Sequence, residues 1–137
     1  MSDDTRISGR CLCGSVRFVL HGPLRDVVVC HCGECRRWHG GAGAYTSVER
    51  DHLELVSEQG LRFVRSPESV TQAERGFCAE CGSSLFWQAG GQTTISVAAG
   101  TLEGETGIRT RGHIYDAERA DWEHVDDLPR VPGSSGL

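Results

Sequence analysis

The sequence contains no lysine and no asparagine, and these absences exclude several kinds of chemistry. All fourteen Lys-plus-Arg residues are arginine, so the chain has no amine for a Schiff base or for a Walker-type phosphate loop. Without asparagine there is no N-glycosylation sequon. Nineteen acidic residues outnumber the basic ones, and the formal net charge of -5 argues against a nucleic-acid partner, because phosphate contacts require a basic face.

Long hydrophobic runs are also missing. No segment approaches the ~18 consecutive apolar residues of a membrane-spanning helix. The polar start, Met1-Ser2-Asp3-Asp4, lacks the apolar run of a signal peptide. We therefore expect a soluble, cytoplasmic protein with no membrane partner. The oligomeric state is left open.

Aromatic residues make up only 7% of the 137 residues and hydrophobic residues 38%, so the core is lean and bound metal ions would help to stabilise it. The length fits one domain, which we place at residues 5–128. Residues 129–137 are rich in Pro, Gly and Ser, and we expect them to form a flexible tail.

Short apolar or alternating runs, bounded by Gly, Pro, Ser or Asp, are typical of a mainly β protein. Residues 33–39 are expected to form a short helix, residues 116–120 a helical turn, and Gly90-Gly91 a hairpin turn. The expected strands are residues 16–20, 27–29, 44–48, 53–56, 61–65, 70–77, 84–87, 93–98 and 112–115.

Seven cysteines occur in three clusters, and in a reducing compartment such clusters bind metal more often than they form disulfides. Cys-x-Cys in extended chain places both side chains on one face, because the side-chain period is two. Cys-x-x-Cys-Gly is typical of a tight turn that presents two thiolates to one ion. The clusters are Cys11-Leu12-Cys13-Gly14, Cys30-His31-Cys32-Gly33-Glu34-Cys35 and Cys78-Ala79-Glu80-Cys81-Gly82.

The spacing favours two zinc ions per chain. Cys11, Cys13, Cys78 and Cys81 would form a closed, structural four-cysteine site, and the central cluster would offer three thiolates and an open fourth position. The alternative is a single zinc ion with spare thiols. A further alternative is that a histidine, such as His31 or His39, fills the fourth position, so that both ions serve only the fold. The residues of the open site are Cys30, Cys32 and Cys35.

Three thiolates give a zinc site a net charge of -1 and blunt its Lewis acidity. Such a site favours a soft fourth ligand, so we expect a thiol as substrate or cosubstrate. His31, Glu34 and His113 are candidate proton carriers, although each has a plain alternative as a hydrogen-bonding or solvated residue.

Three arginines near these motifs are open to two interpretations. Arg36 and Arg37 either bind carboxylates of a substrate by bidentate pairing or lie on an exposed helical face. Arg75 pairs either with the anionic metal site or with a surface carboxylate.

Over nearly its whole length the chain resembles the family of glutathione-dependent formaldehyde-activating enzymes. The resemblance implies the zinc-binding β-tent fold, built of short antiparallel strands with one or two short helices. It also implies a structural zinc ion on Cys11, Cys13, Cys78 and Cys81 and a catalytic one on Cys30, Cys32 and Cys35. The residues that carry it are 9–18, 30–37, 75–83, 100–102, 113–114, 122 and 126–129.

The activity implied by this resemblance is that of a carbon–sulfur lyase, S-(hydroxymethyl)glutathione synthase. Its partners would be a small-molecule thiol, glutathione as a cosubstrate, and an aldehyde, formaldehyde. With glutathione as the thiol, Arg36 and Arg37 are the candidates to bind its carboxylates. The alternative is a non-enzymatic zinc-stabilised binding or chaperone-like module, because β-tent folds also serve as chaperones and interaction domains. The fourth ligand at the Cys30, Cys32 and Cys35 site distinguishes the two.

Overall fold

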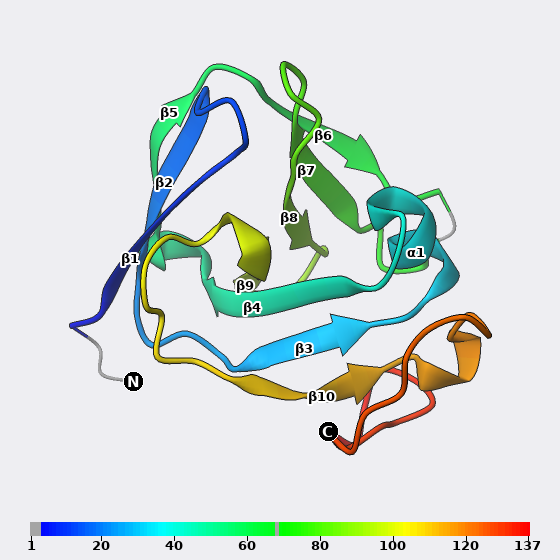
Figure 1. The fold of residues 1–137 in the computed structure, drawn as a ribbon. Coiled ribbons are helices and arrows are strands. Elements are labelled where there is room, and N and C mark those ends of the chain that lie inside the picture. The colour runs from blue at the N-terminus through cyan, green and yellow to red at the C-terminus, as the bar shows by residue number, and fades with distance from the viewer. Residues whose placement is uncertain (1–3, 68) are drawn as a thin grey trace.

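The structure, a computed structural model, describes residues 4–67 and 69–137. Within these residues the chain forms two β-sheets and one short α-helix, α1 (Figure 1). In chain order the elements are β1 (Arg6–Arg10), β2 (Val16–His21), β3 (Val27–Cys30), α1 (Gly33–His39), β4 (Gly43–Glu49), η1 (Arg50–His52), β5 (Leu53–Glu58), β6 (Leu61–Arg65), β7 (Glu74–Cys78), β8 (Ser84–Gln88), β9 (Thr94–Ala98), η2 (Ala99–Thr101), β10 (Thr110–Ile114) and η3 (Asp116–Glu118).

The smaller sheet has the order β1-β2-β5, and both pairings are antiparallel. Its central strand β2 alternates between buried and more exposed positions, and Val16, Phe18 and Leu20 are the buried ones. This period of two lets one face of the sheet pack on the core.

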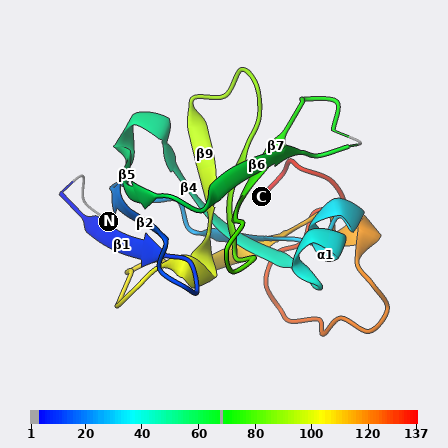
Figure 2. The same cartoon turned by 90° about the horizontal axis from the view of Figure 1, so that it is seen from above.

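The larger sheet has the order β10-β3-β4-β9-β8-β7-β6. Neighbouring strands in this sheet are antiparallel, except that β10 and β3 are parallel. The pairing of β10 with β3 places two segments side by side that are distant in the chain. The helix α1 follows β3 after Cys30 and lies near the segment after β10 in both views (Figures 1 and 2). The sheet thus brings the central cysteine cluster close to residues of β7 and to those after β10.

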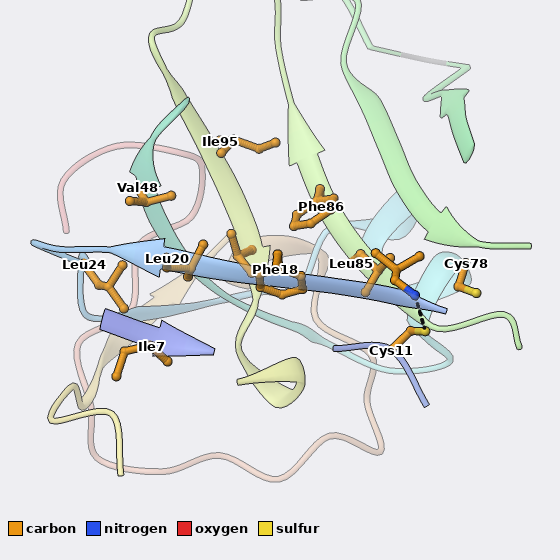
Figure 3. Packing of buried hydrophobic residues seen from close by; sticks show 12 residues of the cluster. Ile7, Cys11, Phe18, Leu20, Leu24, Val48, Cys78, Leu85, Phe86 and Ile95 are labelled. Carbon is orange, nitrogen blue, oxygen red and sulfur yellow. Dashed lines mark hydrogen bonds between the residues drawn. The ribbon is translucent and has the colours of Figure 1, made fainter. Parts of the chain in front are cut away.

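The main hydrophobic core lies between the two sheets. Phe18 of β2 and Phe86 of β8 meet edge to face, with ring centroids 5.1 Å apart. Cys11 and Cys78 belong to the same buried cluster and lie at one end of it (Figure 3). The outer cysteine clusters are therefore built into the core.

The expected mainly β fold is confirmed, as are the short helix at residues 33–39 and the turn at Gly90-Gly91 between β8 and β9. Strand β1 was not expected, because Arg-Ile-Ser-Gly-Arg offers only one large apolar side chain. The strand expected over residues 70–77 begins only at Glu74, because Gln72 has a positive φ of 57° and Ser66 N bonds to Ala73 O across a loop.

Two other expectations concern the C-terminal residues 129–137 and the absence of a membrane-spanning helix. Residues at the start of the expected tail lie beside β10, where the N–H of His113 donates to Pro129 O and that of Val131 to His113 O. The domain limits and the flexibility of the tail stay predictions. None of the helices described is long and apolar enough to cross a membrane.

Candidate metal centres

Cys11 and Cys13, from the β1–β2 turn, converge with Cys78 at the end of β7 and Cys81 in the β7–β8 turn. Their sulfur atoms all lie within 4.8 Å of one another, with Cys11 Sγ 3.7 Å and Cys78 Sγ 3.8 Å from Cys13 Sγ. A tetrahedral zinc ion with Zn–S bonds of about 2.3 Å sets its sulfur atoms about 3.8 Å apart. These distances exceed a disulfide bond of ~2.05 Å, and all seven cysteines are free. The donor set and its spacing therefore fit one four-coordinate zinc ion.

Local backbone geometry explains how these turns aim their sulfur atoms. Gly14 and Gly82, each directly after a cysteine pair, have φ of 83°, in the region that favours glycine. The N–H of Val16 donates to Cys11 Sγ at 3.3 Å. The Ser83 hydroxyl lies 3.2 Å from Cys81 Sγ, and this hydrogen bond is the main reason that the pKa of Cys81 falls to about 5. A low thiol pKa favours the thiolate that binds metal.

Cys30, Cys32 and Cys35 form a second group whose sulfur atoms lie within 4.8 Å of one another. Cys30 ends β3, Cys32 caps α1 by accepting from the N–H of Cys35 at 3.3 Å, and Cys35 lies in the first turn. Hydrogen bonds from Cys30 and then Cys35 hold the pKa of Cys32 well below its usual value. Among the described residues no histidine or carboxylate completes this group as a fourth ligand.

His31 lies between two of these cysteines, but its ring is engaged elsewhere. Its Nδ1 is 2.7 Å from Glu123 Oε1 and its Nε2 is 2.7 Å from His113 Nδ1. His113 Nε2 in turn lies 3.0 Å from Asp126 Oδ1. Ionised carboxylates only accept hydrogen bonds, so the outer nitrogens of the two rings donate to Glu123 and Asp126. These hydrogen bonds connect His113, Glu123 and Asp126 to the loop between β3 and α1.

His39 was the other histidine considered as a fourth ligand. Its Nε2 lies 2.6 Å from the hydroxyl of Tyr45, and it is not part of the three-sulfur group. Burial lowers the pKa of His39 and raises the pKa of Tyr45. Tyr45 belongs to the same buried cluster as Cys30 and Cys35. No signal in the sequence indicated this contact, because nothing in the motif around Tyr45 distinguishes it from other strand residues.

A cavity of about 750 Å³ opens beside the three sulfur atoms. Tyr45, Trp87 and Ile114 form apolar parts of its wall, and Glu34 and Glu118 contribute acidic groups. Its lining also includes the arginines Arg25, Arg37 and Arg75. The central cysteine cluster is thus accessible to a small molecule that carries both apolar and charged groups.

The arginines singled out in the sequence have different surroundings. Arg36 Nη1 donates to Glu118 O and Arg37 Nη1 to Gly33 O, and of these two only Arg37 lines the cavity. Arg75 is buried, and its Nη1 and Nη2 lie 3.6 and 3.7 Å from Cys35 Sγ. Of the two alternatives for Arg75, the structure shows the contact with the cysteine group.

These features define a mainly β protein with two groups of cysteines placed to hold metal ions. The chain matches the family model for the glutathione-dependent formaldehyde-activating enzyme over residues 6–118, and it belongs to that family. It is also similar to a Rhodobacter sphaeroides protein whose crystal structure comes from a structural genomics programme. The two are 25% identical with a TM-score of 0.57, and the match covers 75% of this chain and 97% of that one. A search of curated proteins found no match.

Proposed function

We propose that the protein is a zinc-dependent carbon–sulfur lyase that forms or cleaves a thiol–aldehyde adduct, as S-(hydroxymethyl)glutathione synthase does. The observation that carries this proposal is the three-sulfur group without a fourth ligand from the described residues, placed at the wall of a cavity of about 750 Å³. Membership of a family described by glutathione and formaldehyde supports the choice of a small-molecule thiol and an aldehyde.

The two cysteine groups would have different tasks. Cys11, Cys13, Cys78 and Cys81 would hold a closed zinc ion that stabilises the end of the core. Cys30, Cys32 and Cys35 would hold the second ion, which when bound lowers the pKa of a thiol in its fourth position and so supplies a thiolate.

The chain's own residues would then position the reactants and move one proton. The thiolate sulfur forms a bond to the carbonyl carbon, the C=O π bond breaks, and the alkoxide that results takes a proton. Tyr45 holds a proton at the cavity wall because burial raises its pKa. His39 Nε2, 2.6 Å from the Tyr45 hydroxyl, would take up the proton that the thiol releases when it becomes a thiolate, and would pass it to Tyr45 as Tyr45 protonates the alkoxide. The reverse sequence cleaves the adduct.

The decisive experiment is NMR exchange spectroscopy of glutathione and formaldehyde with the zinc-loaded protein. We expect adduct exchange faster than the uncatalysed reaction, and a return to the uncatalysed rate in Cys32→Ser. The wild type and Cys32→Ser are compared at matched concentration with a sample that contains no protein, and the zinc content of both proteins is measured. A wild-type rate equal to background would contradict the proposal for this substrate pair and favour a binding module.

A further inference from the structure

We propose that Arg75 is a positioning residue that allows the centre formed by Cys30, Cys32 and Cys35 to accept an anionic fourth ligand. The inference rests on the proposed function in assuming that this centre binds zinc and a thiolate. Beyond the proposed function, we infer that the buried guanidinium of Arg75 makes this centre prefer a thiolate to a neutral fourth ligand.

The guanidinium of Arg75 is held from two sides. Its Nη1 and Nη2 lie 3.6 and 3.7 Å from Cys35 Sγ, and its Nε donates to Ser66 Oγ at 2.9 Å. Ser66 Oγ donates onward to Glu34 Oε1 at 3.1 Å. Arg75 is 4% exposed and Ser66 2%, so these contacts are shielded from solvent. The positive charge is therefore fixed against one ligand sulfur.

Counting charges shows what this contact does. Zinc with three thiolates carries -1, and a fourth ligand that binds as thiolate brings the centre to -2. Cys30 and Cys35 are buried, and burying a net charge is costly unless an opposite charge lies close. Arg75 returns the thiolate-bound centre to -1. A neutral fourth ligand leaves the charge unchanged and gains far less from the cation.

The four-cysteine group has no such contact among the described residues. Its sulfur atoms receive hydrogen bonds from the backbone N–H of Val16 and from the hydroxyls of Ser15 and Ser83. Cys13 in that group is exposed, so water can screen its charge. Of the two groups as the described residues form them, the one that faces the cavity has the buried cation beside it, as expected if the cation serves an incoming ligand.

Arginine suits this position better than lysine would. Its planar group provides three directed N–H contacts, two to Cys35 Sγ and one to Ser66 Oγ. A lysine would bring the charge without that geometry. Arg75→Lys should therefore keep part of the preference for thiolates, whereas Arg75→Met should remove it.

The test uses the cobalt-loaded full chain, in which thiolate binding changes the sulfur-to-cobalt absorption bands. Glutathione, 2-mercaptoethanol and imidazole are titrated into the wild type, Arg75→Met and Arg75→Lys. We expect Arg75→Met to bind both thiols roughly ten- to a hundredfold more weakly and imidazole with little change. The matched control is Arg62→Met, an exposed arginine on the adjacent strand β6.

The pattern of losses decides the inference. Equal weakening of imidazole and thiols, or no weakening, would overturn it. Weakening of glutathione alone would also overturn it, because Arg75 would then be pairing with a substrate carboxylate. If Arg75→Met does not fold, Arg75→Lys and Ser66→Ala decide, each with an expected thiol-specific loss of roughly threefold. Because ligand binding is read out, a failure to accelerate adduct formation would contradict the proposed function and leave this result standing.

Discussion

His31 Nε2 lies 2.7 Å from His113 Nδ1, although 82 positions separate the two residues in the chain. The bond joins the loop between β3 and α1 to the parallel strand β10, and carboxylates bind both outer nitrogens. Both histidines are buried. The loop between β3 and α1, which lies between Cys30 and Cys35, is therefore held by buried contacts to β10 and the segment after it.

Glu123→Ala should destabilise the protein. The side chain of Glu123 is only 7% exposed, and it accepts from His31 and from the N–H of Ala120. Removing it leaves buried donors unpaired, so we expect the free energy of unfolding to fall by about 1–3 kcal/mol in denaturant titration. The control is Glu105→Ala at an exposed position. Equal effects of the two substitutions would contradict the role of the histidine pair.

Stability should depend on pH through the two carboxylates of this chain. Hydrogen bonds from the N–H of Leu128 and then from His113 lower the pKa of Asp126 below 3.8. Burial opposes the shift at Glu123, but the N–H of Ala120 and the His31 bond lower its pKa below 4.5. Since both folded-state pKa values are depressed, the stabilisation is full above these ordinary values and is lost as pH falls through the lowered ones.

The pH prediction is checked by unfolding at a series of pH values in wild type and Glu123→Ala. Both proteins keep all seven cysteines, so acid release of metal affects them alike. The difference in unfolding free energy between them should shrink as the pH drops below 4.5. A difference that is constant with pH would show that Glu123 does not contribute through its charge.

The two cysteine groups should respond differently to loss of one ligand. Cys81→Ser should unfold the domain, because it opens the group that is built into the main core with Cys11 and Cys78. Cys35→Ser should lose the second zinc ion and keep more of the fold. Elemental analysis gives the zinc content, and circular dichroism during heating gives the stability. Identical melting of the two variants would rule out the division into structural and open centres.

Tyr45→Phe tests the proposed proton donor. Removing the hydroxyl should slow adduct exchange by roughly a hundredfold, because a positioned acid contributes about that factor or more. The zinc content should not change, since Tyr45 is not a member of either cysteine group. Tyr115→Phe is the matched control, because Tyr115 lines the same cavity. If both variants retain the wild-type rate, another group supplies the proton.

The pairing of cysteines within each cluster could be predicted because its signals are local, and the division of seven cysteines into four and three followed from their number and spacing. Cys-x-Cys in extended chain and Cys-x-x-Cys-Gly in a turn each bring two sulfur atoms together without tertiary information. The bond between His31 and His113 could not be predicted, since it depends on the parallel pairing of β10 with β3. For Arg75 the sequence left two alternatives open, and the contact with Cys35 could not be selected from them because it depends on how β7 lies against α1. Strand β1 was missed because its pairing with β2, rather than its composition, makes it a strand.

Strand β7 has one further consequence. It ends in Cys78, a member of the four-cysteine group, and three residues earlier it carries Arg75, which contacts Cys35 in the other group. Three residues of strand span about 10 Å, so one rigid segment links both centres. We therefore expect assembly to be ordered: the four-cysteine centre loads first, and only then does the guanidinium take its place beside the second. When metal is scarce, the centre formed by Cys30, Cys32 and Cys35 should therefore be the one left empty, so the proposed activity should be lost while the chain still folds.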